Sequence, residues 1–107
     1  MIKPRRKTLT RALLLKILKT EQPYLKEHFG VKRIAIFGSF AKGHPKAKSD
    51  VDIFVQLGKL LGFEFLDMID YLEKRLGRKV EVLTPAGVQS IRVKSISKDI
   101  RRSFVYV

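Results

Sequence analysis

A Gly-Ser pair followed by two closely spaced aspartates is the part of this sequence whose residue types could do chemistry. Gly38 and Ser39 follow one apolar run, and Asp50 and Asp52 stand one residue apart at the start of the next. Alternate side chains of a strand share one face, so both carboxylates are predicted to point the same way. At about 4 Å they would repel by roughly 4 kcal/mol, so a proton, a basic side chain or a divalent cation must compensate.

A third carboxylate stands in a later apolar run. Glu81 lies between Val80 and Val82, so it is expected to project from one face of the strand that these residues form. If that strand lies beside the strand that carries the two aspartates, three carboxylates converge. The alternative is that Glu81 is simply the exposed residue of an edge strand.

The Gly-Ser pair could supply a complementary anion site. A strand that ends at Gly38 and leads into a short helical turn leaves backbone N–H groups free, and such groups suit a phosphate. Taken alone, Ser39 fits an ordinary helix cap, and the aspartates fit solvated acids at a strand end. Taken together, the phosphate cradle and the carboxylate pair indicate a site for a Mg²⁺-bound nucleotide.

The first element that must position these residues is helical. Either Thr8 or Thr10 can cap its beginning. Its apolar face is formed by Leu13, Leu14, Ile17 and Leu18. Pro23 is expected to interrupt this helix or to begin a second one, and Gly30 is expected to end it.

The remaining elements alternate between strand and helix. Strands are predicted at 31–37, 50–57 and 79–84. A helix is predicted from about 62 to 76, with Phe65, Ile69, Leu72 and Leu76 on its apolar side and Glu64, Asp67, Asp70 and Glu73 on its solvent side. Gly77 ends it, and a turn at 85–87, a basic helix at 97–104 and a short tail follow. The pattern predicts an α/β (α+β) domain with a small mixed sheet of about three to four strands flanked by helices.

Composition limits the protein to a single domain. The chain has 107 residues, which we divide into a flexible basic arm at 1–7 and one domain at 8–107. It has no cysteine, so disulfides and thiolate metal sites are excluded. Since no apolar run is long enough for a membrane span or a secretion signal, we expect a cytoplasmic protein without a membrane partner.

Positive charge is concentrated in the first half of the chain. Residues 1–49 hold 13 Lys or Arg against two acids, whereas residues 50–107 hold ten against eight. This field could attract RNA, nucleotides or an acidic protein, or it could be the solvated lysine-rich surface of a heat-adapted protein. Charge alone does not choose between these alternatives.

The stretch GSFAKGHPKAKSDVD resembles a known signature. Gly-Ser, ten further residues and Asp-x-Asp are similar to the motif of the nucleotidyltransferase superfamily, which has the DNA polymerase beta-like fold. GVKRIAIFGSFAKG and LGRKVEVLT resemble the minimal nucleotidyltransferases (MNT) in particular. The resemblance covers roughly residues 10–105 and implies a nucleotidyltransferase fold.

The resemblance also implies roles for individual residues. Gly38 and Ser39 would hold the β- and γ-phosphates of a nucleoside triphosphate, and Lys42 could touch a phosphate. Asp50 and Asp52 would ligate two Mg²⁺ ions. Glu81 would take the place of the third carboxylate, which helps to ligate one metal and to activate the acceptor hydroxyl.

One position departs from the family pattern, because the third carboxylate is usually an aspartate. The extra methylene of Glu81 moves the carboxylate by about 1.5 Å, and a misplacement of 1 Å can cost about 100-fold in rate. An antitoxin that is catalytically weak or inactive, and that neutralises its partner by binding alone, is therefore an alternative.

The resemblance implies a protein partner. Minimal nucleotidyltransferases are typically paired with a HEPN-type toxin, and some of them transfer AMP from ATP to a tyrosine of that toxin. The expected function is therefore a Mg²⁺-dependent nucleotidyltransferase that acts as the antitoxin of such a pair. An RNA-binding protein is the less favoured reading, because the aromatic residues of the motif flank the carboxylates and do not stud a basic strand.

Overall fold

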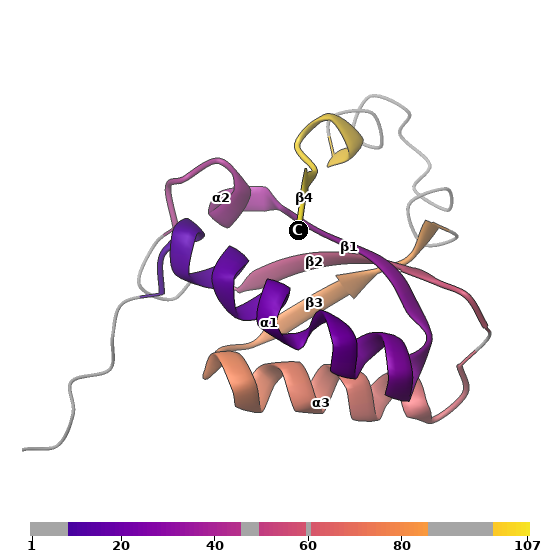
Figure 1. The fold of residues 1–107 in the computed structure, drawn as a ribbon. Coiled ribbons are helices and arrows are strands. Elements are labelled where there is room, and N and C mark those ends of the chain that lie inside the picture. The colour runs from indigo at the N-terminus through magenta and orange to yellow at the C-terminus, as the bar shows by residue number, and fades with distance from the viewer. Residues whose placement is uncertain (1–8, 46–49, 60, 86–99) are drawn as a thin grey trace, which may run out of the picture.

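The computed structural model describes residues 9–45, 50–59, 61–85 and 100–107, and Figure 1 shows their arrangement. The elements are α1 (Arg11–Phe29), β1 (Val31–Phe37), α2 (Gly38–Ala41), β2 (Val51–Leu57), α3 (Glu64–Leu76), β3 (Val80–Leu83) and β4 (Val105–Tyr106). The four strands form one sheet in the order β3-β2-β1-β4. The predicted small mixed sheet flanked by helices is confirmed. The predicted arm at 1–7, the turn after Pro85 and the first residues of the last helix lie outside the described residues.

The sheet combines both strand orientations. The central strand β1 is antiparallel to β2 on one side and to β4 on the other, whereas β2 and β3 run parallel. A parallel pair needs a crossover connection, and α3 supplies it. The short strand β4 comes from the part of the chain that the sequence indicated only as a tail.

The first helix runs through Pro23, so the expected break at that residue is wrong. The Thr10 hydroxyl caps the helix by accepting a hydrogen bond from the Leu13 N–H at 3.1 Å, and Gly30 ends it in the left-handed conformation. Leu14, Leu18, Leu25 and Phe29 are buried. Burial of each such side chain contributes about 1.5–3 kcal/mol, which together exceeds the cost of about 3 kcal/mol for an internal proline.

Two apolar clusters lie on opposite faces of the sheet. The larger one packs α1 and α3 against the inward side chains of the strands, which include Val51, Ile53 and Val55. The smaller one lies on the other face and consists of Ala35, Phe37 and Phe54, covered by Leu83, Ile100 and Phe104. Residues 100–102 are helical, in agreement with the predicted basic helix. In the part of the chain that the structure describes, no helix has the length and apolar character that a membrane span requires.

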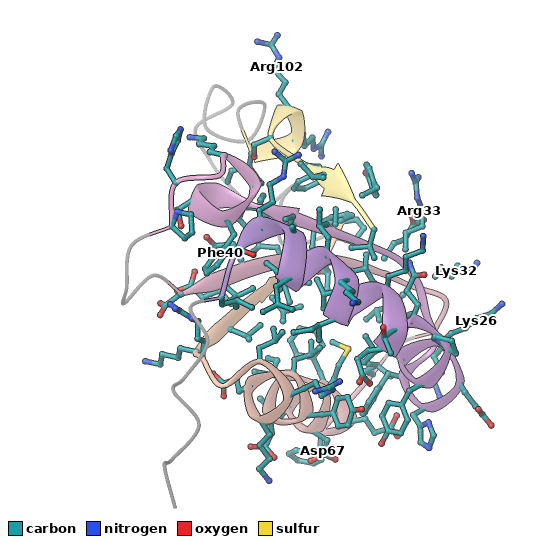
Figure 2. All side chains as sticks on the ribbon, turned by 60° about the vertical axis from the view of Figure 1, so that its left-hand side comes forward. Lys26, Lys32, Arg33, Phe40, Asp67 and Arg102 are labelled. Carbon is teal, nitrogen blue, oxygen red and sulfur yellow. The ribbon has the colours of Figure 1, made fainter. Side chains whose placement is uncertain are left out.

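The helix α3 is tied to the strand that follows it. Figure 2 shows Asp67 on its outer side, where the sequence places it. Glu73, in contrast, was expected to face solvent, and this is wrong: it is half-buried, and its Oε2 accepts a hydrogen bond from the Val80 N–H at 3.0 Å. Gly77 ends the helix in the left-handed conformation, as predicted. The Glu73 bond fixes the first residue of β3, directly before Glu81.

A buried acid joins the two long helices. Glu21 of α1 is only 8% exposed, and it accepts hydrogen bonds from the Tyr71 hydroxyl and, at 2.7 Å, from the Arg75 Nε of α3. These bonds, that of Tyr71 first, lower the pKa of Glu21 below its ordinary value. The acid thus satisfies its buried oxygens while it holds α1 against α3.

Replacing this acid with its amide is expected to weaken the fold. A carboxyl with a lowered pKa stabilises the folded state above its unfolded pKa of about 4.3, and the contribution is lost as the pH falls through the folded value. The Glu21→Gln variant should therefore lose about 1–3 kcal/mol in urea unfolding at pH 7, and much less at pH 3. The exposed Glu27→Gln is the matched control. An equal deficit of Glu21→Gln at both pH values would contradict this role.

Candidate functional site

Two of the three predicted carboxylates lie side by side on one row of the sheet. Asp52 of β2 is the register partner of Glu81 in the parallel strand β3 and of Phe37 in β1. Residues in register across neighbouring strands point to the same face, so Asp52 and Glu81 project together. Since Val51 and Ile53 are fully buried beneath the helices, the acids lie on the opposite face of the sheet.

The carboxylates perturb one another. Burial raises the pKa of Asp52 most; the charges of Glu81 and Asp50 and a side-chain hydrogen bond with Glu81 raise it further, to about 6. Each of these influences disfavours the charged form of Asp52. Two ion pairs among the described residues lie on the helices, where Lys74 pairs with Asp70 and Arg75 with Glu21.

The Asp52 carboxylate lies so close to Gly38 that no side chain fits at this position. Its φ is +70°, which is the left-handed region that favours glycine. A Cβ at this position would lie 2.2 Å from the Asp52 Oδ2 and 3.1 Å from its Cγ. The turn that opens α2 therefore packs directly against the Asp52 carboxylate. Phe40, which is fully buried in the larger cluster, anchors this turn.

Ser39 and Lys42 lie in that turn. The cap position of α2 belongs to Phe37, which makes no side-chain cap bond, so the reading of Ser39 as an ordinary cap is wrong. The Ser39 carbonyl accepts a hydrogen bond from the His44 N–H at 3.0 Å. Lys42 is exposed at the C-terminal end of α2, and its N–H donates to the Gly38 carbonyl at 3.1 Å. The turn is therefore fixed by its own backbone, whereas contacts of these residues with a phosphate stay predictions.

Asp50 stands one residue before β2 and influences Asp52 through its charge. No set of three or more His, Cys, Asp or Glu side chains within the described ranges is close enough to hold a metal ion. The structure therefore brings together Asp52 and Glu81, but not all three acids as one ligand set. This arrangement fits Mg²⁺, which is commonly bound by one or two carboxylates together with substrate phosphates and water. It does not fit a cation that needs a cage made only of protein ligands.

An aromatic cluster borders the acids, and its C-terminal member was not recognised in the sequence. Phe104 stacks on Phe54, with 4.4 Å between ring centroids, and lies 5.8 Å from the ring of Phe37. Phe54 is two residues beyond Asp52 on the same face. Phe104 comes from the far end of the chain, and only the pairing of β4 with β1 brings it here. The available signal would have been Phe104 next to the β-branched and aromatic residues of the VYV run, which was interpreted only as a tail.

Comparisons with known proteins found a matching family model and similar relatives. The family model described as nucleotidyltransferase domain matches residues 14–107. The chain is 36% identical over 92 residues to protein adenylyltransferase MntA of Thermococcus cleftensis, which covers 85% of this chain and 89% of that relative.

Solved structures share the fold. A minimal nucleotidyltransferase structure superimposes with a TM-score of 0.71 at 21% identity, over 92% of this chain and 97% of that chain. A complex of tri-AMPylated HEPN toxin with MNT antitoxin from Shewanella oneidensis is also similar, with a TM-score of 0.52 at 15% identity over 90% of this chain and 66% of that chain.

Proposed function

Because the chain belongs to the nucleotidyltransferase domain family, we propose that it is a Mg²⁺-dependent adenylyltransferase that acts on a partner protein. The observation that carries the proposal is the contact of the Gly38 turn with Asp52, which in turn pairs with Glu81. The proposed phosphate site would thereby lie next to the proposed cation site, as transfer from a nucleoside triphosphate requires.

The proposed roles follow from the types and places of the residues. Asp52 and Glu81, with Asp50 next to them, would hold Mg²⁺ together with the triphosphate. The cation would neutralise the phosphate charge and stabilise the departing pyrophosphate. Gly38 and Ser39 would direct N–H groups and a hydroxyl at the phosphates. Glu81 is proposed to accept the proton of the attacking hydroxyl. The hydroxyl oxygen then forms a bond to the α-phosphorus, and the bond from this phosphorus to the departing pyrophosphate breaks.

The relatives suggest the acceptor. The relative from Thermococcus cleftensis is named a protein adenylyltransferase, and the complex from Shewanella oneidensis pairs an MNT antitoxin with an AMPylated HEPN toxin. By this likeness, we propose that the acceptor is a hydroxyl of a HEPN-type toxin and that the chain is its antitoxin. ATP would be the nucleotide.

The test is transfer to such a partner in the presence of Mg²⁺ and ATP. Intact mass of the HEPN-type partner should increase by adenylyl groups, and EDTA should prevent the increase. Glu81→Gln should slow the transfer by about 100-fold, because an amide cannot accept the proton. The exposed Glu64→Gln is the matched control. Full activity of Glu81→Gln would rule out this role, and neutralisation of the toxin without any mass increase would show an antitoxin that acts by binding alone.

A further inference from the structure

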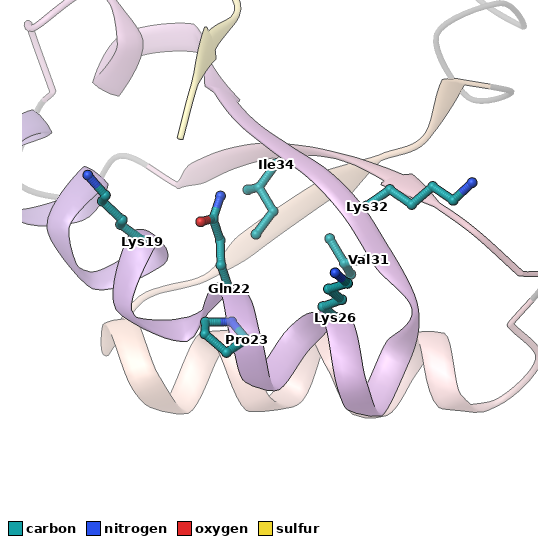
Figure 3. A pocket seen from close by; sticks show the side chains of 7 residues that line it. All are labelled: Lys19, Gln22, Pro23, Lys26, Val31, Lys32 and Ile34. Carbon is teal, nitrogen blue, oxygen red and sulfur yellow. The ribbon is translucent and has the colours of Figure 1, made fainter.

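A groove lies between the second half of α1 and the edge of β1 that pairs with β4. Its lining does not include the three acids of the candidate site. Its volume is about 510 Å³, and Figure 3 shows the side chains that line it. Lys19, Gln22, Pro23 and Lys26 come from one side of α1. Val31, Lys32 and Ile34 come from β1. Val31 and Ile34 are buried, so the groove combines an apolar floor with a lysine rim.

The rim carries positive charge without a counter-charge. Lys19, Lys26 and Lys32 are exposed, and the described residues that line the groove include no acid. Within the described residues, none of the three lysines forms an ion pair with an acid. Figure 2 shows Lys26 and Lys32 reaching outward along one edge of the molecule, together with Arg33. The groove is thus electrostatically suited to an acidic ligand.

Among the described residues, the edge of β1 that borders the groove is paired over only part of its length. β4 pairs with β1 only at Ala35 and Ile36, and the Val107 N–H donates to the Ile34 carbonyl at 2.9 Å. The side-chain amide of Gln22 donates a hydrogen bond from Nε2 to the Val107 carbonyl at 3.2 Å. Beyond this point no strand in the described part of the chain pairs with residues 31–33 on that edge. Among the described residues, the backbone groups of residues 31–33 on this edge therefore have no strand partner, and another extended chain can pair with them.

We propose that this groove binds an extended acidic segment of the partner protein, which adds to the edge of β1 in line with β4. Backbone hydrogen bonds to β1 would provide the pairing, apolar side chains would contact Val31 and Ile34, and acidic side chains would meet the lysines. The inference rests on the proposed function in one respect, namely that a protein partner exists. It places the docking surface away from the carboxylates, so that the partner is held at one site and modified at another.

The experiment measures fluorescence anisotropy of a short labelled peptide of alternating valine and glutamate. Lys19→Glu/Lys26→Glu should weaken its binding at least about tenfold, equivalent to about 1.4 kcal/mol. Arg11→Glu/Lys74→Glu changes the net charge equally outside the groove and should change binding less than about twofold. A peptide of the same charge with proline in place of the valines cannot pair as a strand and should also bind at least about tenfold more weakly.

Each contrary result has a definite meaning. Equal losses in both double variants, or equal binding of the proline peptide, would overturn the inference and leave only a general attraction of charge. Tighter, groove-dependent binding of single-stranded RNA would assign the lysines to nucleic acid and also overturn it. Because the assay contains neither ATP nor Mg²⁺, its failure leaves the proposed transfer reaction standing, and a failure of transfer leaves the peptide result standing.

Discussion

The Asp52→Asn variant is expected to lose adenylyl transfer by about 100- to 1,000-fold, and yet to be more stable than the natural protein without metal. The loss follows because Asp52 is the proposed cation ligand at the centre of the carboxylate row and contacts both the Gly38 turn and Glu81. Removal of one such electrostatic contribution typically costs about 3–4 kcal/mol in the transition state. The same carboxylate explains the gain in stability. Asparagine removes the negative charge of Asp52, which burial and the neighbouring acids disfavour in the folded state.

The sign of the stability change depends on pH. The folded pKa of Asp52 is raised to about 6, whereas an unfolded aspartate titrates near 3.9. The protonated acid therefore favours folding below pH 4, and this contribution is lost as the pH rises through 6. Full burial would make a two-unit shift worth about 3 kcal/mol; since Asp52 is half-exposed, about 1 kcal/mol is expected, or about 4–8 °C in Tm. Asp52→Asn should show this advantage in EDTA at pH 7.5 and lose it at pH 4.

Asp67→Asn is the control for this variant, because it removes an exposed aspartate on α3 and leaves the carboxylate row intact. It should retain transfer and should not gain stability between pH 4 and 7.5. Mg²⁺ with ATP should stabilise the natural protein and the Asp67 variant, but not Asp52→Asn. Transfer at the natural rate by Asp52→Asn would exclude the proposed site, and a lower Tm at pH 7.5 would show that its charge does not oppose folding.

The carboxylate row could be predicted from the sequence because it follows from the alternation of side chains within a strand. Val51 and Ile53 are apolar and had to face the helices, which places Asp52 on the other side. The same reasoning applies to Glu81 between Val80 and Val82. Their register was not predictable, since it depends on how α3 returns the chain and on the bond between Glu73 and the Val80 N–H. The alternation of residues along a strand therefore predicts on which face of the sheet a side chain lies. Tertiary contacts decide which residue of the neighbouring strand lies beside it.

The features that escaped prediction depend on contacts between distant residues. Pro23 has a local tendency to break a helix, but burial of Leu18 and Leu25 on either side of it keeps α1 continuous. β4 has only two residues, and its pairing with β1 defines it. Gly38 was expected to form part of a phosphate site, and the structure shows a further reason for glycine at this position, which is space for Asp52. Sequence spacing alone cannot show such a clash.

Because of that clash, Gly38→Ala is the second substitution that we expect to reduce adenylyl transfer strongly. Ordinary van der Waals contact begins at 3.4 Å, so a Cβ that would lie 2.2 Å from the Asp52 Oδ2 must displace this carboxylate by about 1 Å. A misplacement of that size can cost about 100-fold in rate, so transfer and calorimetric binding of Mg²⁺-ATP should both fall by about that factor. The positive φ adds about 1–2 kcal/mol of backbone strain, which should appear as a lower Tm.

Gly43→Ala separates these two effects. Gly43 has a similar φ of +79°, but a Cβ there would meet nothing within 4 Å. It should therefore lower the Tm about as much as Gly38→Ala while it retains transfer and nucleotide binding. If Gly43→Ala loses the same activity, strain in the loop and not the position of the carboxylate controls the site. If Gly38→Ala binds Mg²⁺-ATP normally, the carboxylate moves without consequence, and the cation must be held elsewhere than at Asp52.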